Sequence, residues 1–249
     1  MARNWSNGKT AAGIDAHSRR ARACGCRFER RAMTLASEGV AKIIVCDVAP
    51  DERRRFDRTQ RRWGAVAHCA GLVGQCGGWS REERARAVIF AYWNNRDFYD
   101  AFMKAEHDAV AVRQRGAYES AAIALSSDIV PIADDDPPRL STTLRTATFA
   151  RVADCHVKAN RVETFVQAQH RVWNPGMATT AGMLGGSFAR DEGNHDRFVV
   201  TSFCADSQSH ARYEAEVFPA LYERAEPSHD LLSIMSYFVD LEAAWRVIP

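Results

Sequence analysis

The sequence of 249 residues lacks several features that would assign it to a broad class of protein. It has no apolar run of about 18 residues, the length that a membrane-spanning helix requires. Its formal net charge of +2 is too small to indicate binding to nucleic acid or to an anionic membrane. A glycine-rich dinucleotide fingerprint is also missing. The sequence therefore favours a globular protein that binds a small molecule, with no nucleic acid and no membrane as partner.

Disulfide scaffolding is not indicated either. The chain has seven cysteines, an odd number, and is long enough to fold without disulfide staples. Cys46, Cys155 and Cys204 lie inside apolar runs, where cysteine acts as a small hydrophobic residue. We therefore expect reduced thiols and a cytoplasmic protein.

The N-terminal segment, residues 1–38, is rich in arginine and lacks the apolar region of a secretory signal. We expect it to be a disordered basic tail, with Met33 as an alternative start. Cys24-x-Cys26 is a single close pair of cysteines without a second pair, which is a weak indication of a metal site.

A repeated phrase indicates how the rest of the chain is organised. The stretch GLVGQCGGWS begins at Gly71, and a near copy, GMLGGSFARD, begins 111 residues later at Gly182. The preceding segments VCDVAPDERRRFDRTQRRW and ADCHVKANRVETFVQAQHRVW also align. The offset holds over roughly 80 residues apart from small adjustments, which indicates an internal duplication.

Both copies show the same order of patterns. In the first, the β-branched run 41–48 predicts a strand, and a helix with Phe56 and Trp63 on one face follows. The glycine-rich strand, a strand at 86–93, a second helix and a last strand complete the order βαββαβ. This is a ferredoxin-like unit, with both helices on one face of a four-stranded antiparallel sheet.

A single unit would expose the other, apolar face of its sheet. We therefore predict an α+β fold in which two tandem ferredoxin-like repeats pack sheet to sheet as an α+β barrel. The predicted boundaries are 39–125 for repeat 1, 126–147 for a linker rich in proline and aspartate, and 148–249 for repeat 2.

These features resemble the dimeric α+β-barrel superfamily that includes the antibiotic-biosynthesis monooxygenases. The resemblance rests on the tandem order, on the segments AYWNNRDFYDAF and SFCADSQSHARY, and on VWNPGMATTAGMLGG. A tandem single-chain form of this size is similar to the oxygenases that open the B ring of angucycline polyketides of the jadomycin, gilvocarcin and kinamycin type.

The resemblance implies an oxygenase that inserts oxygen from O₂ into a polycyclic aromatic phenol or hydroquinone. The protein would bind and orient the ring and stabilise negative charge. No metal and no tightly bound cofactor are implied; reduced flavin, FADH2 or FMNH2, supplied by a flavin reductase is a second electron source. A homodimer of the whole chain is one expected assembly.

Three residues are candidates for the chemistry. His107 borders the apolar face of a helix, and histidine is a suitable base for a phenol near neutral pH, although a helix-edge histidine with one hydrogen bond is the plainer interpretation. His68, in AVAHCAG, is either a second candidate base or a loop histidine. Trp93 is a candidate to hold the substrate oxygen. Because Phe218 occupies the place of His107 in repeat 2, we expect proton transfer to depend on repeat 1.

Five further residues are candidates for binding the substrate: Trp63, Tyr92, Asn94, Trp173 and His156. The two tryptophans hold equivalent positions after the first helix of each repeat, as packing residues or as a stacking wall. Tyr92 and its neighbour Trp93 must point to opposite faces of their strand. Asn94 is expected to cap the following helix. His156 shares a strand face with Asp154, which permits a carboxylate-oriented imidazole.

Two alternatives remain open. One is a haem-dependent enzyme, because chlorite dismutase-like and haem-degrading proteins share this barrel; His107 or His210 would then be the axial ligand. His210 is otherwise expected on the surface. The other is a non-catalytic barrel that binds a small molecule.

Overall fold

The computed structural model describes residues 38–133 and 140–249. The expected basic tail, its Cys24-x-Cys26 pair and Met33 lie outside the described residues. Within the described residues, no helix has the length and apolar character needed to cross a membrane.

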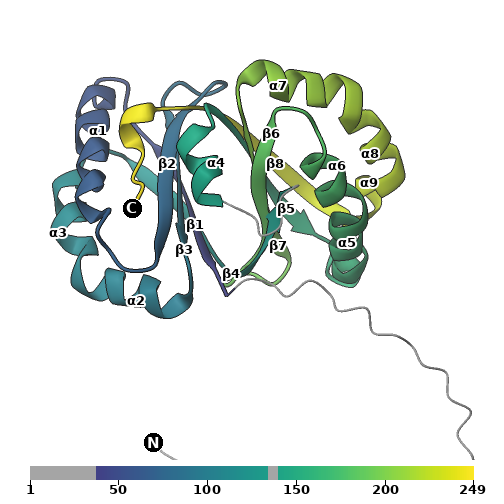
Figure 1. Ribbon diagram of the computed structural model, residues 1–249, viewed down its shortest axis with the longest axis horizontal. Helices are drawn as coiled ribbons and strands as arrows, with labels where there is room; N and C mark the ends of the chain where they lie inside the picture. The colour runs from purple at the N-terminus through teal and green to yellow at the C-terminus, as the bar shows by residue number, and fades with distance from the viewer. Residues whose placement is uncertain (1–37, 134–139) are drawn as a thin grey trace, which may run out of the picture. The chain divides into compact units, whose positions relative to one another are not determined.

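The described chain consists of two copies of the order βαββαβ (Figure 1). The elements of the first copy are β1 (Val40–Asp47), α1 (Arg53–Gln60), β2 (Leu72–Ser80), β3 (Arg86–Trp93), α2 (Arg96–Ala105), α3 (His107–Ala111) and β4 (Ser120–Ile132). Those of the second are β5 (Phe149–Val157), α5 (Val162–Ala168), α6 (Asn174–Ala178), β6 (Met183–Asp191), β7 (Arg197–Cys204), α7 (Ser207–Arg212), α8 (Phe218–Ala225), α9 (Pro227–Asp230) and β8 (Leu231–Leu241).

The segment expected to be a linker is partly regular. Strand β4 continues to Ile132, and α4 (Leu140–Thr146) lies just before β5. The strand is longer than expected because β4 pairs with β6 as well as with β1, so hydrogen-bond partners are available as far as Ile132. Pro131 is tolerated within this stretch, where the register between the two strands also shifts.

The eight strands form one closed antiparallel barrel in the order β1-β3-β2-β8-β5-β7-β6-β4. Each repeat contributes four neighbouring strands, and the barrel closes where β2 pairs with β8 and β4 pairs with β6. Two tandem ferredoxin-like repeats packed as an α+β barrel are therefore confirmed. Closure gives every strand two partners, which removes the exposed sheet edges that promote aggregation.

The repeated glycine phrase forms the second strand of each repeat. Gly71 and Gly182 have left-handed backbones, with φ of 75° and 82°, at the turns that lead into β2 and β6. A register shift follows in both strands, between Leu72 and Gly74 and between Met183 and Gly185. The expected bulge is thus present at the same place in both repeats.

The barrel interior is filled by side chains from both repeats. Phe90 and Phe203 meet edge to face with ring centroids 5.3 Å apart. The buried Tyr92 hydroxyl lies 3.1 Å from Ser187 Oγ and 2.9 Å from Thr201 Oγ1 in the other repeat. These side chains fill the barrel interior around Tyr92 and connect the two repeats.

The helices lie on the outer faces of the sheet, those of repeat 1 at one end and those of repeat 2 at the other (Figure 1). Equivalent caps start the helices that follow β3 and β7. Asn95 accepts a hydrogen bond from Phe98 N at 3.1 Å, and Asp206 accepts one from Ser209 N at 2.7 Å. The expected cap at Asn94 is wrong by one residue, because the Asn94 amide still donates to Gly71 O at 2.8 Å and extends the pairing of β3.

The C-terminal segment ties repeat 2 to repeat 1. Val247 exchanges two backbone hydrogen bonds with Gln75 of β2. Trp245 is fully buried against Phe56 and Trp79, and its Nε1 donates to Asp57 at 2.8 Å. This contact stabilises the first helix of repeat 1 from the end of repeat 2.

Barrel closure at the seam between β2 and β8 can be tested at Gly78. A Cβ at this position would overlap the carbonyl oxygen of Asp240 on β8. We expect Gly78→Ala to lower the free energy of unfolding by about 1–3 kcal/mol in urea titrations, because the backbone must move apart. The matched control is Gly64→Ala, where a Cβ would have no neighbour within 4 Å. An equal effect of both changes would contradict the described seam.

Candidate functional site

Each repeat holds a cavity between its helices and the outer face of its sheet. The cavity of repeat 1 has a volume of about 280 Å³ and that of repeat 2 about 380 Å³. Ligand pockets usually measure about 300–1,000 Å³ and combine apolar walls with a few polar groups. Both cavities are therefore suited to a small, mainly apolar ligand.

A lysine lies at the floor of the repeat 1 cavity. Lys42 projects from the centre of β1, in phase with Ile44 and Cys46, and is only 9% exposed. Its Nζ lies 3.8 Å from Met103 Sδ and 5.6 Å from the ring centroid of Tyr99, and it has no carboxylate partner among the described residues. Burial lowers the pKa of Lys42. The cavity therefore contains a cation that has no acidic partner within residues 38–133 and 140–249.

Aromatic rings form the walls around this lysine. The Trp93 and Phe102 rings stack with centroids 4.7 Å apart at 29°. Trp63 lies across from them, and its Nε1 donates to Gln114 Oε1 at 3.1 Å. Gln114 in turn donates to Gln60 Oε1 at 2.7 Å. The hydrogen-bond chain fixes the Trp63 ring, so the wall is held in one orientation.

A second buried amide borders the same cavity. Gln75 of β2 is 7% exposed, and its Nε2 has no hydrogen-bond partner among the described residues. An unpaired buried donor is unfavourable, and a ligand oxygen would satisfy it. Lys42 and Gln75 are therefore the polar groups best placed to receive an oxygen atom.

His107 lies at the side of the cavity, at the start of α3. Its ring centroid is 5.8 Å from that of Trp63 and 5.9 Å from that of Phe102. Nδ1 lies 2.9 Å from Asp108 Oδ1, and the side chain is 23% exposed. A hydrogen bond from Nδ1 to a carboxylate leaves Nε2 available as a base.

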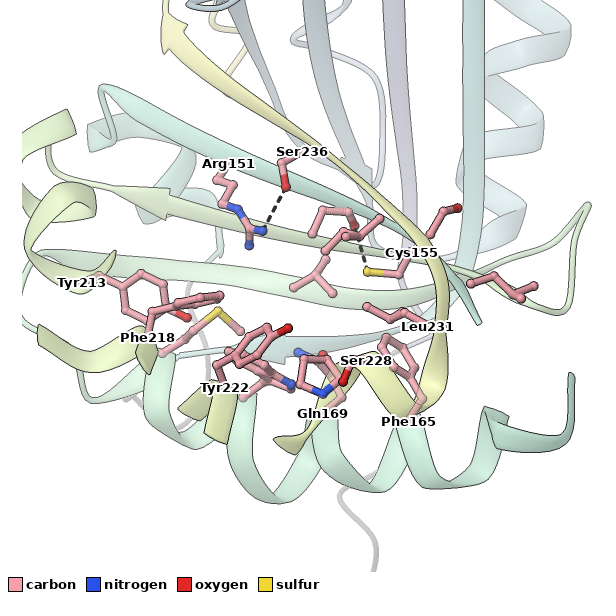
Figure 2. A pocket seen from close by; sticks show the side chains of 18 residues that line it. Arg151, Cys155, Phe165, Gln169, Tyr213, Phe218, Tyr222, Ser228, Leu231 and Ser236 are labelled. Carbon is pink, nitrogen blue, oxygen red and sulfur yellow. Dashed lines mark hydrogen bonds between the residues drawn. The ribbon is translucent and has the colours of Figure 1, made fainter. Parts of the chain in front are cut away.

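The cavity of repeat 2 is equivalent in position and different in chemistry. Arg151 stands where repeat 1 has Lys42, and Phe218 starts the helix where repeat 1 has His107. Figure 2 shows Arg151 and Ser236 side by side on one wall and Tyr213, Phe218 and Tyr222 around the space. Burial raises the pKa of Cys155, another lining residue, to about 12, so its thiol is a neutral part of the wall.

The structure brings together only part of the expected site. Trp63, Trp93 and His107 line the repeat 1 cavity, and Trp173 lines the repeat 2 cavity. Tyr92 points into the barrel interior, away from both cavities, because strand side chains alternate and Trp93 takes the outer face. Tyr92 therefore lies outside both cavities, and its expected role in substrate binding stays a prediction without a cavity beside it in the described structure.

Three other expected positions lie away from the cavities. Asn94 is exposed at the end of β3. His68 is exposed in a turn, where Nδ1 lies 2.8 Å from Ala65 O. His156 is 44% exposed, and its Nε2 is 3.9 Å from Asp154 Oδ1. Asp154 pairs instead with Arg197, at 2.6 and 2.9 Å, because the guanidinium offers two parallel donors.

His210 is buried, whereas the sequence indicated a surface position. It is 3% exposed among the rings of Phe149, Tyr213 and Phe238, and burial lowers its pKa to about 4. It occupies the place of Tyr99 in repeat 1 and does not line the cavity of repeat 2. Across residues 38–133 and 140–249, no group of three or more acidic, histidine or cysteine side chains is arranged to hold a metal ion.

The sequence-based search missed Lys42, Arg151 and Gln75. The signal for Lys42 is a cation inside the apolar run AKIIVCDV, in phase with residues that face the helices. Arg151 occupies the equivalent position in FARVADCHV of repeat 2. A charged residue at the same strand position in both copies indicates a shared cavity floor.

Residues 40–126, which cover repeat 1, match a family model described as a domain of unknown function, DUF4937. Over 98 residues the chain is 32% identical to the uncharacterized protein YdbC of Bacillus subtilis, and the match covers 39% of this chain and 79% of that protein. The chain belongs to this family. Its first repeat corresponds to the DUF4937 domain, and the second repeat supplies the other half of the barrel.

Solved structures similar to this DUF4937 protein cover both repeats. A proposed monooxygenase of Lactobacillus acidophilus superposes with a TM-score of 0.64 at 13% identity, covering 84% of this chain and 96% of that one. An anthrone oxidase-like protein gives 0.58 at 11% identity over 82% and 92% of the two chains. A proposed chlorite dismutase gives 0.57 at 14% identity over 83% and 96%. At these identities the likeness shows the fold alone.

The buried state of Lys42 has a measurable consequence for stability. Because its pKa is lower in the folded protein than the ordinary 10.5, the folded state binds the proton less firmly than the unfolded chain does. The unfavourable effect of the charge is complete below the folded-state pKa and is relieved as pH rises toward 10.5. We expect Lys42→Met to raise the free energy of unfolding at pH 7 on the order of 1 kcal/mol, with a smaller gain at higher pH.

The control for this measurement is Lys104→Met, at an exposed position on α2. Urea unfolding of both variants across pH 7–10.5 makes the comparison. A destabilised Lys42→Met protein, or a gain that grows with pH, would contradict the described environment of Lys42.

Proposed function

We propose that the protein is an oxygenase that acts on a flat polycyclic aromatic phenol in the cavity of repeat 1. The observation that carries the proposal is Lys42, a buried cation that has no counter-ion in the part of the chain that the structure describes and that shares its cavity with stacked aromatic rings. Such a floor favours a ligand that is planar, apolar and negatively charged at one oxygen. A phenolate has these three properties.

The residues of the cavity support a reaction that starts from the phenolate. His107 Nε2 accepts the proton of the phenol, while Asp108 holds the other ring nitrogen. The phenolate oxygen lies between Lys42 and the free amide of Gln75. The electron-rich ring then transfers one electron to O₂, and the resulting radical pair combines to form a carbon–oxygen bond. Loss of water from this peroxide leaves a carbonyl group, so a CH₂ carbon and O₂ become C=O and H₂O.

Repeat 1 is the proposed centre of this chemistry because repeat 2 lacks its base. Phe218 stands in place of His107, and Cys204 in place of Trp93. One solved structure with this fold is an anthrone oxidase-like protein. Anthrone tautomerises to a tricyclic phenol, which belongs to the proposed substrate class.

A narrower form of the proposal is cleavage of a ring carbon–carbon bond in an angucycline polyketide during antibiotic biosynthesis. Reduced flavin from a flavin reductase would then keep a quinone substrate in its oxidisable form. Mass spectrometry of products formed under ¹⁸O₂ separates simple carbonyl formation from ring opening, because ring opening leaves labelled oxygen on a cleaved skeleton.

The proposal is tested by oxygen uptake with anthrone and related polycyclic phenols. We expect His107→Phe to lower kcat by about 10²-fold or more, because the base is removed while phenylalanine already fills the matching place in repeat 2. Lys42→Met should also lower kcat, since it removes the charge that stabilises the phenolate. His68→Ala is the control, because His68 is exposed outside the cavity.

Three outcomes would contradict the proposal. An unchanged rate in both His107→Phe and Lys42→Met would place the chemistry outside this cavity. A Soret band in freshly purified protein would favour the haem-dependent alternative. Absence of uptake with every phenol tested, together with tight binding of those phenols, would favour a non-catalytic binding protein.

A further inference from the structure

The repeat 2 cavity takes no part in the proposed oxygenation. It is the larger of the two, and its floor carries Arg151. We propose that this cavity is a second binding site, whose ligand is a flat aromatic carboxylate. The inference does not depend on the oxygenase proposal, because it concerns binding in the other repeat.

Arg151 lacks an acidic partner among the described residues. Its Nη2 donates to Ser236 Oγ at 3.0 Å, and no carboxylate among the described residues pairs with it. Two other arginines of repeat 2 are paired with acids: Arg197 with Asp154 and Asp191, and Arg161 with Asp230. Arg151 is therefore a cation held in place by a neutral hydroxyl, with donors on Nε and Nη1 that are free among the described residues.

The donor group of Arg151 has a shape that suits a carboxylate. A guanidinium is planar and matches the two oxygens of a carboxylate with parallel hydrogen bonds, whereas the ammonium of Lys42 is a point charge. A phosphate dianion would call for more positive charge than this single arginine supplies. The substitution of arginine for lysine between the repeats thus favours a carboxylate in repeat 2 and a phenolate in repeat 1.

Aromatic rings form a wall of the cavity that contains Arg151. Trp173 and Phe218 pack with ring centroids 5.5 Å apart, and Tyr213 and Tyr222 border the same space (Figure 2). Flat aromatic groups stack on such rings. The hydroxyls of Ser228 and Ser233 lie on the lining of the same cavity. The ligand therefore places an aromatic body on the rings and its carboxylate on Arg151.

The probe for this site is 2-naphthoate, measured by isothermal titration calorimetry with the full chain. We expect Arg151→Met to raise the Kd about tenfold or more and Arg151→Lys, which keeps the charge without the planar fork, to raise it about threefold or more. Lys104→Met, at an exposed position on α2, is the control and should leave the Kd unchanged, whereas Lys42→Met tests whether the probe binds in repeat 1 instead. Methyl 2-naphthoate, which has no charge, should bind the wild-type protein at least about tenfold more weakly.

Trp173→Phe locates the bound probe. Quenching of tryptophan fluorescence by 2-naphthoate should decrease in this variant, because Trp173 lines the repeat 2 cavity. Urea unfolding confirms that each variant is folded, and Arg151→Lys serves if Arg151→Met does not fold. The proposal is overturned if the Kd is unchanged in Arg151→Lys and Arg151→Met, if Lys42→Met weakens binding as much as they do, or if the methyl ester binds equally well. None of these results involves oxygen uptake, so failure here leaves the oxygenase proposal standing.

Discussion

Closure of the barrel is the constraint on which the other features depend. Each four-stranded sheet has an inner apolar face that one repeat cannot cover, and pairing of β2 with β8 and of β4 with β6 encloses both faces. The enclosed space is filled by Phe90, Tyr92 and Phe203. The two cavities that could take a ligand lie on the outer faces, between the helices and the strands, one in each repeat.

A single chain allows the two cavities to differ. In a dimer of identical units, every substitution would appear in both sites. Here Lys42 and Arg151 occupy the same strand position, and His107 and Phe218 the same helix start. The two floors therefore carry different cations, and among the described residues a histidine lines only the repeat 1 cavity. The backbone bulges and helix caps stay equivalent, because both repeats must still fit the same closed barrel.

Several features were predictable from the sequence because they depend on local periodicity. The offset between the glycine phrases placed the strands, and alternation along β3 placed Tyr92 and Trp93 on opposite faces. The site was less predictable, because it depends on which face of the sheet the helices cover. That choice sends Tyr92 inward and leaves Lys42 on the cavity floor, and neither position follows from the residue type alone.

The ion pairs and the burial of individual side chains could not be predicted from the sequence either. Asp154 and His156 share a strand face as expected, yet Asp154 pairs with Arg197 from the neighbouring strand, which periodicity along one strand cannot show. His210 lies four residues after Asp206 in a helix. Its aromatic neighbours come from β5, from the next helical turn and from β8. Its burial is a property of the assembled repeat.

The buried side chain of Lys42 is the feature on which the proposed binding of a phenolate depends. Burial disfavours the charged form of Lys42. A phenolate bound beside it would stabilise the charged form by pairing with the ammonium. The protein should therefore bind a phenol as its anion at a pH where the free phenol is neutral. The absorbance spectrum of 2-naphthol bound under anaerobic conditions at pH 7 tests this claim directly. We expect the spectrum of naphtholate in the wild-type protein and that of neutral naphthol in Lys42→Met. The spectrum of neutral naphthol in the wild-type protein would contradict the proposed role of Lys42.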